Sequence, residues 1–563
     1  MMTASCEDAA PVIKVRRGRG GSVVALNRVT ERLKAQRPSL LQSCGNGYRY
    51  LWRTVSIMSL RNLLLRVLLL LGICQVRHWG IASSSKMKEQ PEKIAVIGGG
   101  IGGTGAAYFL RQEFGPSVKI DVFEAGPVGG RLATENIRGH DYETGGSIIH
   151  PLNLHMKHFV DRLASQCYLM HISDMARPVE HSRLAVIAIF DGKKLTFDEG
   201  LKSSRLQKWV EGILSKFMRI YQYQQSGYSF SSMEQLLHGL GGDGFLTLLN
   251  QTLEEVMLAD GFSQVFIDNV VTPLSRFAFG QTADLTALVG AVSLACADSG
   301  QWAVDGGNKR VCSELLSHTK AELIQARVTD ISLKMKPSES GTESSFYEVN
   351  YVGDSGPAHS IYDIVIVATP LHEGLSDISF SGFSPPIPSP FPGHYHHLVT
   401  TLVLGQVNTS YLGIDQKPAD FDVSDIFTTD NEALAFNSLS SVDPTQLPPG
   451  YHRSPVNESK VWKFFSQEPL SEEQLREIFV SWEGVWEKRW LAYPSYSSSP
   501  HPMPPFVLHD RLYYLSAIEW AASCMELSVV AARNMALLAY HHWHDQTYKI
   551  DQEDLHPRLR EEL

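Results

Sequence analysis

Cysteine is scarce in this sequence: there are seven residues in 563, and four of them lie beyond residue 82. No C-x-x-C pair occurs, which excludes a dithiol redox motif, and so few cysteines exclude a disulfide-dense scaffold. One bridge between Cys296 and Cys312 fits the sequence, and so do two buried free thiols. We therefore expect the fold to depend on its core rather than on cross-links.

Basic residues are also fewer than acidic ones: the sequence has 50 Lys and Arg against 60 Asp and Glu, which gives a formal net charge of −10. An acidic chain argues against nucleic acid as a partner. Residues 1–57 are an exception, with ten basic and three acidic residues. We expect them to be an upstream basic extension, separate from the folded body. Hydrophobic residues make up 43% of the chain, which is enough for a large globular core.

The sequence has no apolar run long enough to span a bilayer. The best candidate, Leu63–Ile73, follows Met58, is interrupted by Arg66 and precedes a stretch of small residues. This layout is typical of a secretory signal peptide, which we place at residues 58–82. The alternative interpretation is a basic cytosolic tail on a signal anchor. No second apolar span follows, so we expect no transmembrane segment in the body.

Three N-x-S/T triplets agree with passage through the secretory pathway. They start at Asn250, Asn408 and Asn457. We therefore predict glycosylation at these asparagines and a secreted or lysosomal destination.

The stretch KIAVIGGGIGGTGAAYFL, residues 93–110, joins a predicted strand to a predicted helix through glycines. In the pattern G-x-G-x-x-G, the first glycine permits a tight turn, the second lets backbone approach a pyrophosphate, and the third allows close helix–strand packing. These glycines are Gly98, Gly100 and Gly103. A second predicted strand, Val118–Ala125, brings Glu124 to 21 residues after the third glycine, where a carboxylate accepts hydrogen bonds from an adenosine ribose. The sequence therefore predicts a dinucleotide site.

More glycines follow the second strand and distinguish between dinucleotides. They fall in two groups: Gly129 and Gly130 with Arg131, then Gly145 and Gly146. An arginine beside glycines supplies a charged fork to phosphate. This pairing resembles the flavin amine-oxidase superfamily, and the resemblance implies FAD as the cofactor.

Elements of the distal half match the same superfamily. Residues 326–333 and 362–370 are predicted strands of the nucleotide-binding domain, and the resemblance places Val328 at the adenine. The region 511–540 resembles the closing FAD motif. In that motif a strand ends at an acidic residue, here Glu519, and a helix beginning near Met525 points at the flavin. The glycines usual at this turn are absent here.

Longer blocks resemble one family within this superfamily. GGRLATENIRGHDYETGGSIIHPLNLHMKHFV begins at residue 129, FSSMEQLLHGLGGDGFLTLLNQTL at 230 and LVGAVSLACADSGQWAVDGGNKRVCSELL at 288. Together with VWKFFSQEPLS, they resemble the prenylcysteine oxidase family, closest to its prenylcysteine oxidase-like branch. The resemblance covers about residues 92–563, and residues 164–205 fit it poorly.

The resemblance implies an α/β fold, with a Rossmann-type FAD-binding domain of the glutathione-reductase and amine-oxidase kind and a helical and mixed-sheet substrate domain. The FAD-binding domain is expected to be discontinuous, at 93–150, 300–370 and 500–545. The substrate domain takes 151–299 and 371–499. Residues 151–300 have apolar residues at helical spacing, and the stretch 396–407 begins the strands of a mixed sheet. The charged end, 546–563, is expected to be a solvated tail.

A flavin enzyme needs few catalytic side chains, because the cofactor takes the hydride and the protein orients the substrate. The superfamily resemblance places Gly306 and Gly307 at the flavin ring. His150 is the one catalytic candidate, and a helix-capping role fits it equally. No metal is expected. The two histidine clusters, around residues 394–397 and 541–544, lack cysteine or acidic partners at ligand spacing.

The family resemblance implies oxidation of a prenyl thioether with O₂ and water, giving a prenyl aldehyde, free cysteine and hydrogen peroxide. The helical insert 205–258 offers a candidate apolar tunnel, and an ordinary helical core is the alternative. Its expected lining is Trp209, Ile213, Phe217, Tyr221, Leu236, Leu248 and Leu258. The other functions considered are an FAD-stabilised lipid or prenyl carrier, associated with lipoprotein particles, and a flavin amine oxidase.

Overall fold

The computed structural model describes residues 90–164, 176–178, 186–197, 203–295, 300–337, 343–414, 423–448, 450–451, 458–497 and 503–561. The predicted extension at 1–57, the signal peptide at 58–82, Cys167, Cys296 and Asn457 lie outside these residues. Within the described part, no helix has the length and apolar character needed to cross a bilayer.

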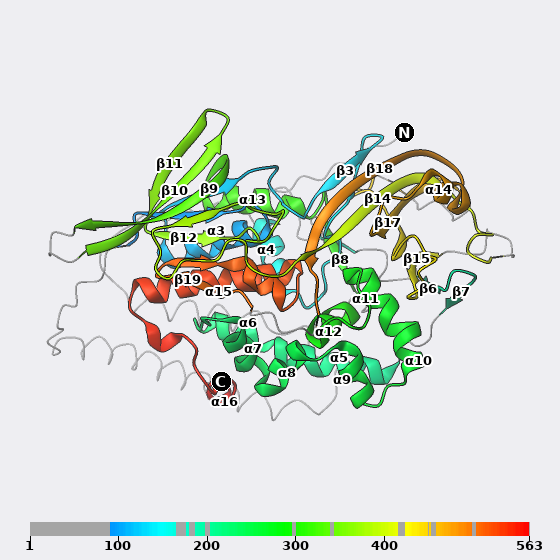
Figure 1. The fold of residues 1–563 in the computed structure, drawn as a ribbon, viewed down its shortest axis with the longest axis horizontal. Helices are drawn as coiled ribbons and strands as arrows, with labels where there is room; N and C mark the ends of the chain where they lie inside the picture. The colour runs from blue at the N-terminus through cyan, green and yellow to red at the C-terminus, as the bar shows by residue number, and fades with distance from the viewer. Residues whose placement is uncertain are drawn as a thin grey trace, which may run out of the picture. The chain divides into compact units, whose positions relative to one another are not determined.

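A parallel sheet forms the centre of the nucleotide-binding part (Figure 1). Strand β1 (Lys93–Ile97) lies between β2 (Lys119–Glu124) and β12 (Ile364–Val367), and all three run parallel. β20 (Leu512–Tyr514) continues the sheet beside β12. The buried β-branched run of β1 and the helix that follows it confirm the predicted strand–turn–helix. This order is that of a doubly wound α/β sheet, and the predicted fold class is confirmed.

A β-meander covers one side of these strands. β9 (Glu322–Pro337) starts parallel to β2 and then pairs with β10 (Glu343–Gly353), which pairs with β11 (Gly356–Tyr362). The hydroxyl of Tyr362 donates to Asp121 of β2 at 2.8 Å. Short strands β13 (Ser379–Ser381) and β19 (Val507–His509) complete the sheet. The predicted boundary at residue 370 places β13 in the substrate domain, whereas the structure pairs it with β9.

Helix α3 (Ile101–Phe114) packs against both α13 (Lys309–Thr319) and α15 (Met525–Trp543). A Cβ atom on Gly102 would lie near Ser528, and one on Gly105 would lie 3.5 Å from Ala532. The contact residue numbers rise together along the two helices, from Gly102 and Ser528 to Gly105 and Ala532. The helices α3 and α15 therefore run parallel and start at the same end. α15, the helix predicted to begin near Met525, is buried on nearly every side.

A second sheet lies in the substrate part of the chain, with seven strands in the order β18-β14-β17-β16-β15-β6-β7. Its β15–β6 pair is parallel and its other pairs are antiparallel, so the predicted mixed sheet is confirmed. The strands are β6 (Val186–Phe190), β7 (Leu195–Phe197), β14 (Tyr395–Val407), β15 (Val423–Thr428), β16 (Ser438–Ser441), β17 (Lys460–Ser466) and β18 (Phe479–Pro494). β6 and β7 lie within 151–300, where helical spacing of apolar residues predicted helices, so the prediction is wrong for these two strands.

Helices dominate residues 151–300, as predicted. They are α4 (Leu154–Ala164), α5 (Ser204–Phe217), α6 (Arg219–Gln225), α7 (Met233–Gly241), α8 (Asp243–Asn250), α9 (Leu253–Ala259), α10 (Gln264–Phe266), the π-helix η5 (Ile267–Val271), α11 (Thr272–Phe279) and α12 (Ala287–Ala295). The remaining short elements are β3 (Thr134–Ile137), β4 (His140–Glu143), β5 (Ala176–Pro178), β8 (Trp302–Val304), α14 (Glu472–Ile478), the 3₁₀ helices η7 (Leu515–Trp520) and η8 (Thr547–Lys549), and α16 (Leu555–Glu561).

The predicted solvated tail over 546–563 is wrong for its described part. Leu555 and Leu559 are 2% and 4% exposed and join the main hydrophobic core. The carboxylate of Asp551 also accepts the backbone N–H of Ser231 at 2.8 Å. The high charge of this segment hid the i, i+4 spacing of its two leucines, which lies on one face of α16.

We predict that Leu555→Ala destabilises the protein by about 2–5 kcal/mol, the usual cost of truncating a buried leucine. Urea unfolding of the variant and the parent measures the difference. Glu553→Ala, at an exposed position two residues away, is the matched control and should change the free energy of unfolding by less than about 0.5 kcal/mol. Equal effects of the two substitutions would mean that α16 does not contribute to the core.

Candidate functional site

The turn between β1 and α3 has the geometry of a phosphate cradle. Gly98 has φ +116°, a conformation that favours glycine, and a Cβ on Gly103 would collide with the carbonyl oxygen of Gly98. Only backbone without side chains fits here. No side chain caps the start of α3, and its first turn has no acidic residue. The N–H groups of that turn and the positive end of the helix dipole are therefore available to an anion.

Glu124, at the end of β2, ties this turn to the next glycine segment. Its Oε2 accepts the backbone N–H of Gly99, and its Oε1 accepts that of Gly126, both at 2.7 Å. Two carboxylate oxygens offer about four acceptor positions, so further positions remain for the predicted ribose hydroxyls. Val328 is buried in β9, three residues beyond Gln325, whose side chain donates to the carbonyl oxygens of Glu124 and Gly126.

The second glycine segment lies directly against the first. The N–H of Gly129 donates to the carbonyl oxygen of Gly99 at 3.0 Å, and Gly130 lies beside Gly100. A Cβ on Gly145 would collide with the carbonyl oxygen of Arg131, and the side chain of Met525 lies 3.8 Å from where a Cβ of Gly146 would be. The structure thus brings together the glycine turns and the start of α15. The predicted residues that meet here are Gly98, Gly100, Gly103, Glu124, Gly130, Arg131, Gly145, Gly146 and Met525.

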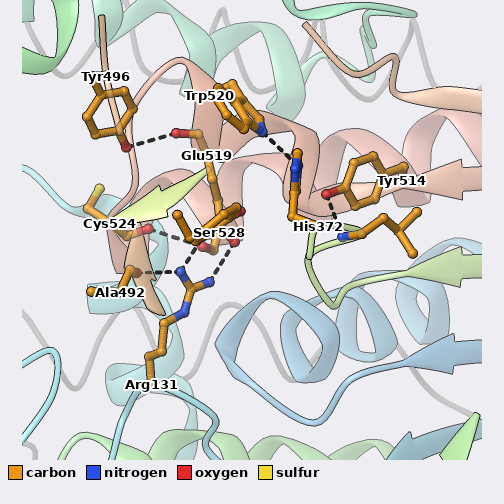
Figure 2. A network of polar contacts seen from close by, with 11 residues as sticks. Arg131, His372, Ala492, Tyr496, Tyr514, Glu519, Trp520, Cys524 and Ser528 are labelled. Carbon is orange, nitrogen blue, oxygen red and sulfur yellow. Dashed lines mark hydrogen bonds and ion pairs between the residues drawn. The ribbon is translucent and has the colours of Figure 1, made fainter. Parts of the chain in front are cut away.

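Arg131 and Glu519 form a two-pronged ion pair (Figure 2). Both terminal nitrogens of Arg131 donate to the carboxylate of Glu519, at 2.6 and 2.7 Å, and one also donates to the carbonyl oxygen of Ala492. The fork predicted to hold phosphate is therefore directed at Glu519. The prediction that Glu519 ends a strand is also wrong, because β20 ends at Tyr514 and Glu519 lies in η7.

Asn308 connects the third glycine pair to this site, and no role was predicted for its side chain. Gly306 and Gly307 have φ +80° and +100° and turn the chain from β8 into α13. The side chain of Asn308 then donates to the carbonyl oxygen of Gly146 at 2.9 Å, and its N–H donates to Glu143 at 2.6 Å. Asn308 is fully buried, and the one sign of it in the sequence is its position directly after two glycines.

Lys463 of β17 is a second residue that the sequence did not single out. Its Nζ lies 3.1 Å from the hydroxyl of Ser147, next to the glycine pair at 145–146. Burial lowers the pKa of Lys463 to about 8, against the opposing effect of the Glu143 and Asp425 carboxylates. A buried lysine in a strand has no sequence signature of its own.

An apolar cavity of about 1070 Å³, counting its solvent-open part, lies between the helices and the start of α15. Four of the seven predicted lining residues face it: Ile213, Phe217, Tyr221 and Leu236. The other three predictions are wrong, because Trp209, Leu248 and Leu258 do not line it. The remaining lining residues are Ile148, His150, Leu152, Asn153, Leu214, Met218, Leu237, Leu288, Ala291, Val292, Ala295, Gln301, Ile518, Ala521, Ala522, Cys524, Glu526 and Leu527.

His150 lines this cavity and also accepts hydrogen bonds from the backbone that follows it. Its Nδ1 accepts the N–H of Leu152 at 3.1 Å, and its carbonyl oxygen accepts that of Asn153 at 3.0 Å. Both interpretations of this residue therefore have a structural counterpart: a side chain facing the cavity and a cap ahead of α4.

Glu526, in the first turn of α15, is the one Asp, Glu, Lys or Arg among the lining residues of this cavity. It is 3% exposed. Its carboxylate accepts the N–H groups of His155 and Met156 at the start of α4, at 2.7 and 3.0 Å, and the hydroxyl of Tyr221 at 2.7 Å. Burial raises the pKa of Glu526, and these hydrogen bonds oppose the rise.

The modification and metal predictions have different outcomes. Asn250 is exposed at the end of α8, whereas the side-chain nitrogen of Asn408 donates to the carbonyl oxygen of Glu477 at 3.0 Å. Cys312 is a free, buried cysteine, which agrees with the free-thiol alternative rather than with a bridge, while Cys296 lies outside the described residues. Burial raises the pKa of the Cys312 thiol to about 12.

Within the described ranges, no three His, Cys, Asp or Glu side chains gather as metal ligands.

We predict that Gly103→Ala abolishes retention of a bound dinucleotide, because the added methyl group would force β1 and α3 apart. Gly105→Ala in the same helix is the matched control, since its Cβ would make ordinary contacts of 3.5–3.6 Å. The cofactor absorbance of the purified variants, normalised to protein, measures the effect. Full retention by Gly103→Ala would contradict the cradle.

Comparisons with known proteins identify the family and the fold of this chain. The family profile described as "Prenylcysteine lyase" matches residues 179–552, and the profile "NAD(P)-binding Rossmann-like domain" matches residues 96–163. Among solved structures, a double mutant of putrescine oxidase superposes with a TM-score of 0.51 at 14% identity, over 80% of this chain and 99% of that one. A likeness at this identity establishes the fold alone.

Prenylcysteine oxidase 1 of Bos taurus is 45% identical over 508 residues, covering 88% of this chain and 97% of that protein. Prenylcysteine oxidase 1 of Homo sapiens is 45% identical over 523 residues, covering 90% and 99%. Prenylcysteine oxidase 1-like of Bos taurus is 41% identical over 500 residues, covering 86% and 97%. Of these three, the two prenylcysteine oxidase 1 proteins share the higher identity, rather than the branch that the sequence blocks resembled. A profile over more than half of the chain and relatives 41–45% identical over at least 86% of it establish that the chain belongs to the prenylcysteine oxidase family.

Proposed function

We propose that this chain is an FAD-dependent oxidase that cleaves prenylcysteine, with O₂ and water, to a prenyl aldehyde, cysteine and hydrogen peroxide. The observation that carries the proposal is the apolar cavity, which ends against the start of α15 beside the glycine segments. Family membership supplies the substrate class. When bound, the flavin accepts a hydride from the carbon next to sulfur. Water then adds to the oxidised carbon and gives a hemithioacetal. The C–S bond of the hemithioacetal breaks, which releases the aldehyde and the cysteine thiol.

The residues present fit a flavin dinucleotide. The glycine turns at 98–103 and 129–130 leave a cradle that Cβ atoms would fill, and α3 and α15 both direct their N-termini at it. We infer that the first turn of α3 holds the pyrophosphate and that Glu124 holds the ribose. The Gly145–Gly146 turn, held by Asn308, would then support the ring.

The cavity suits a prenyl chain better than a small amine. Its helical wall is contributed by aliphatic and aromatic side chains of α5, α7 and α12. Burying each methylene-sized unit of such a chain contributes about 0.8 kcal/mol, so many apolar contacts suffice for binding without a charge pair along the chain. The amine oxidases among the structural neighbours share the fold only, and the prenyl thioether is therefore the favoured substrate.

We predict that the purified protein releases hydrogen peroxide when mixed with farnesylcysteine in air. In the absence of oxygen, the same substrate should bleach the flavin absorbance, because the hydride then stays on the cofactor. Binding without bleaching would reduce the protein to a lipid or prenyl carrier. Bleaching by amines alone would overturn the proposal.

We further propose that the protein enters the secretory pathway and is secreted or lysosomal, where a lipid-binding cavity also suits association with lipoprotein particles. The support is the layout of residues 58–82 and the exposed position of Asn250. Expression of the chain from Met58 should yield an endoglycosidase-sensitive product in the medium or in lysosomes. Asn250→Gln should shorten the glycan ladder by one step. An unglycosylated cytosolic product would contradict the proposal.

A further inference from the structure

The cavity has two chemically different walls. The helical wall, from α5, α7 and α12, is apolar. The rest of the lining comes mainly from Tyr221, Gln301, the segment 148–153 and residues 518–527, and it carries Glu526 together with His150 and Asn153. The carboxylate of Glu526 thus brings a formal charge into the lining of a largely apolar space. Such a charge is costly to bury unless it is paired.

We propose that Glu526 is the specificity residue of this cavity and binds the α-ammonium group of a zwitterionic amino-acid thioether. The proposal rests on the proposed function and names the group that recognises the head of the substrate. It separates ligands with a free amine from otherwise identical ligands without one.

The hydrogen bonds of Glu526 leave room for this role. Oε1 accepts from His155 and Tyr221, and Oε2 accepts from Met156 alone. Of about four acceptor positions on a carboxylate, three are taken, and one remains on Oε2. Among the described residues, no Lys or Arg side chain bonds to either oxygen, so the bonds to Glu526 come from neutral groups. Burial lowers the pKa of the neighbouring His155 to about 4, so that ring is neutral at physiological pH.

The chemistry of the substrate places its head on the same wall. In a prenylcysteine, the ammonium nitrogen and the carbon that loses hydride are separated by four bonds, through Cα, Cβ and sulfur. Both must therefore lie near the same end of the cavity. Glu526 follows Met525, whose side chain lies 3.8 Å from where a Cβ of Gly146 would be, in the predicted cofactor segment. An ammonium group at Glu526 thus keeps the thioether near that segment and directs the apolar chain toward the helices.

A purely structural role for Glu526 makes a different prediction. The carboxylate joins α15 to the start of α4 and to Tyr221, so its loss alone would loosen the cavity wall. A loosened wall weakens the binding of every ligand that uses the cavity, with or without an amine. Discrimination between two such ligands is therefore the quantity that separates the two roles.

The test uses the full protein with bound cofactor and two ligands, farnesylcysteine and 3-(farnesylthio)propionate, which differ only in the amine. Oxygen-free calorimetry measures their dissociation constants, and oxygen-free flavin bleaching measures the reaction rate with each. We expect Glu526→Gln to weaken farnesylcysteine binding about 10- to 100-fold, the loss of a hydrogen bond to a charged group, and to change propionate binding less than about threefold. Glu211→Gln, the same charge change on an exposed position of α5, is the matched control and should alter neither.

Equal weakening of both ligands by Glu526→Gln, or unchanged discrimination, would overturn the proposal. If Glu526→Gln fails to fold, Glu526→Asp replaces it: the shorter side chain withdraws the carboxylate by one methylene and should reduce the preference for the amine. An unchanged preference in that variant would count against Glu526. Discrimination in binding without any bleaching by farnesylcysteine would support Glu526 while refuting the proposed oxidase. The two failures are therefore distinguishable.

Discussion

The ion pair between Arg131 and Glu519 is the constraint on which the arrangement of the site depends. Arg131 follows the second glycine turn, and Glu519 lies in η7, which leads the chain into α15. The same carboxylate accepts the hydroxyl of Tyr395, and Arg131 donates to the carbonyl oxygen of Ala492, both from the second sheet. Glu519 is 2% exposed, and loss of its partner would leave a buried, unpaired charge, which is the costly way to break such a pair. One carboxylate therefore holds a glycine turn, the start of a helix and the second sheet in a single geometry.

The parallel packing of α3 and α15 adds an electrostatic constraint. Two parallel helices that start at the same end bring two positive dipole ends together, each equivalent to about half an elementary charge. The first turn of α3 contains no acidic residue, and the carboxylate of Glu526 in α15 is directed at α4 instead. Glu526 offsets the positive end of α15, whereas no acidic side chain in the first turn of α3 offsets the positive end of that helix. A bound anionic group would do so for α3, which is a physical reason for the glycine turns to lie there.

Sequence could predict the parts of the site that depend on local chemistry. The strand, glycine turn and helix over 93–114 follow from neighbouring residues, and Glu124 follows from a fixed spacing. Contacts between distant segments could not be predicted from the sequence. Asn308, just before α13, and Lys463 of β17 contact residues 146 and 147, and neither residue belongs to a recognisable motif. The fork of Arg131 was given to phosphate because Glu519, its actual partner, lies 388 residues away. The tail was misjudged for a different reason, since its charge outweighed the two leucines that enter the core.

The two walls of the cavity come from different segments of the chain, so substitutions in them have different structural costs. The polar wall comes from segments that also hold the glycine turns and the ion pair, so a substitution there disturbs several tightly packed groups at once. The helical wall comes from α5, α7 and α12, which supply apolar side chains without taking part in those contacts. Its shape can therefore be altered at the cost of ordinary repacking, which is small when volume is conserved. For the proposed function, we therefore expect chain-length preference to depend on the helical wall and reaction geometry on the polar wall.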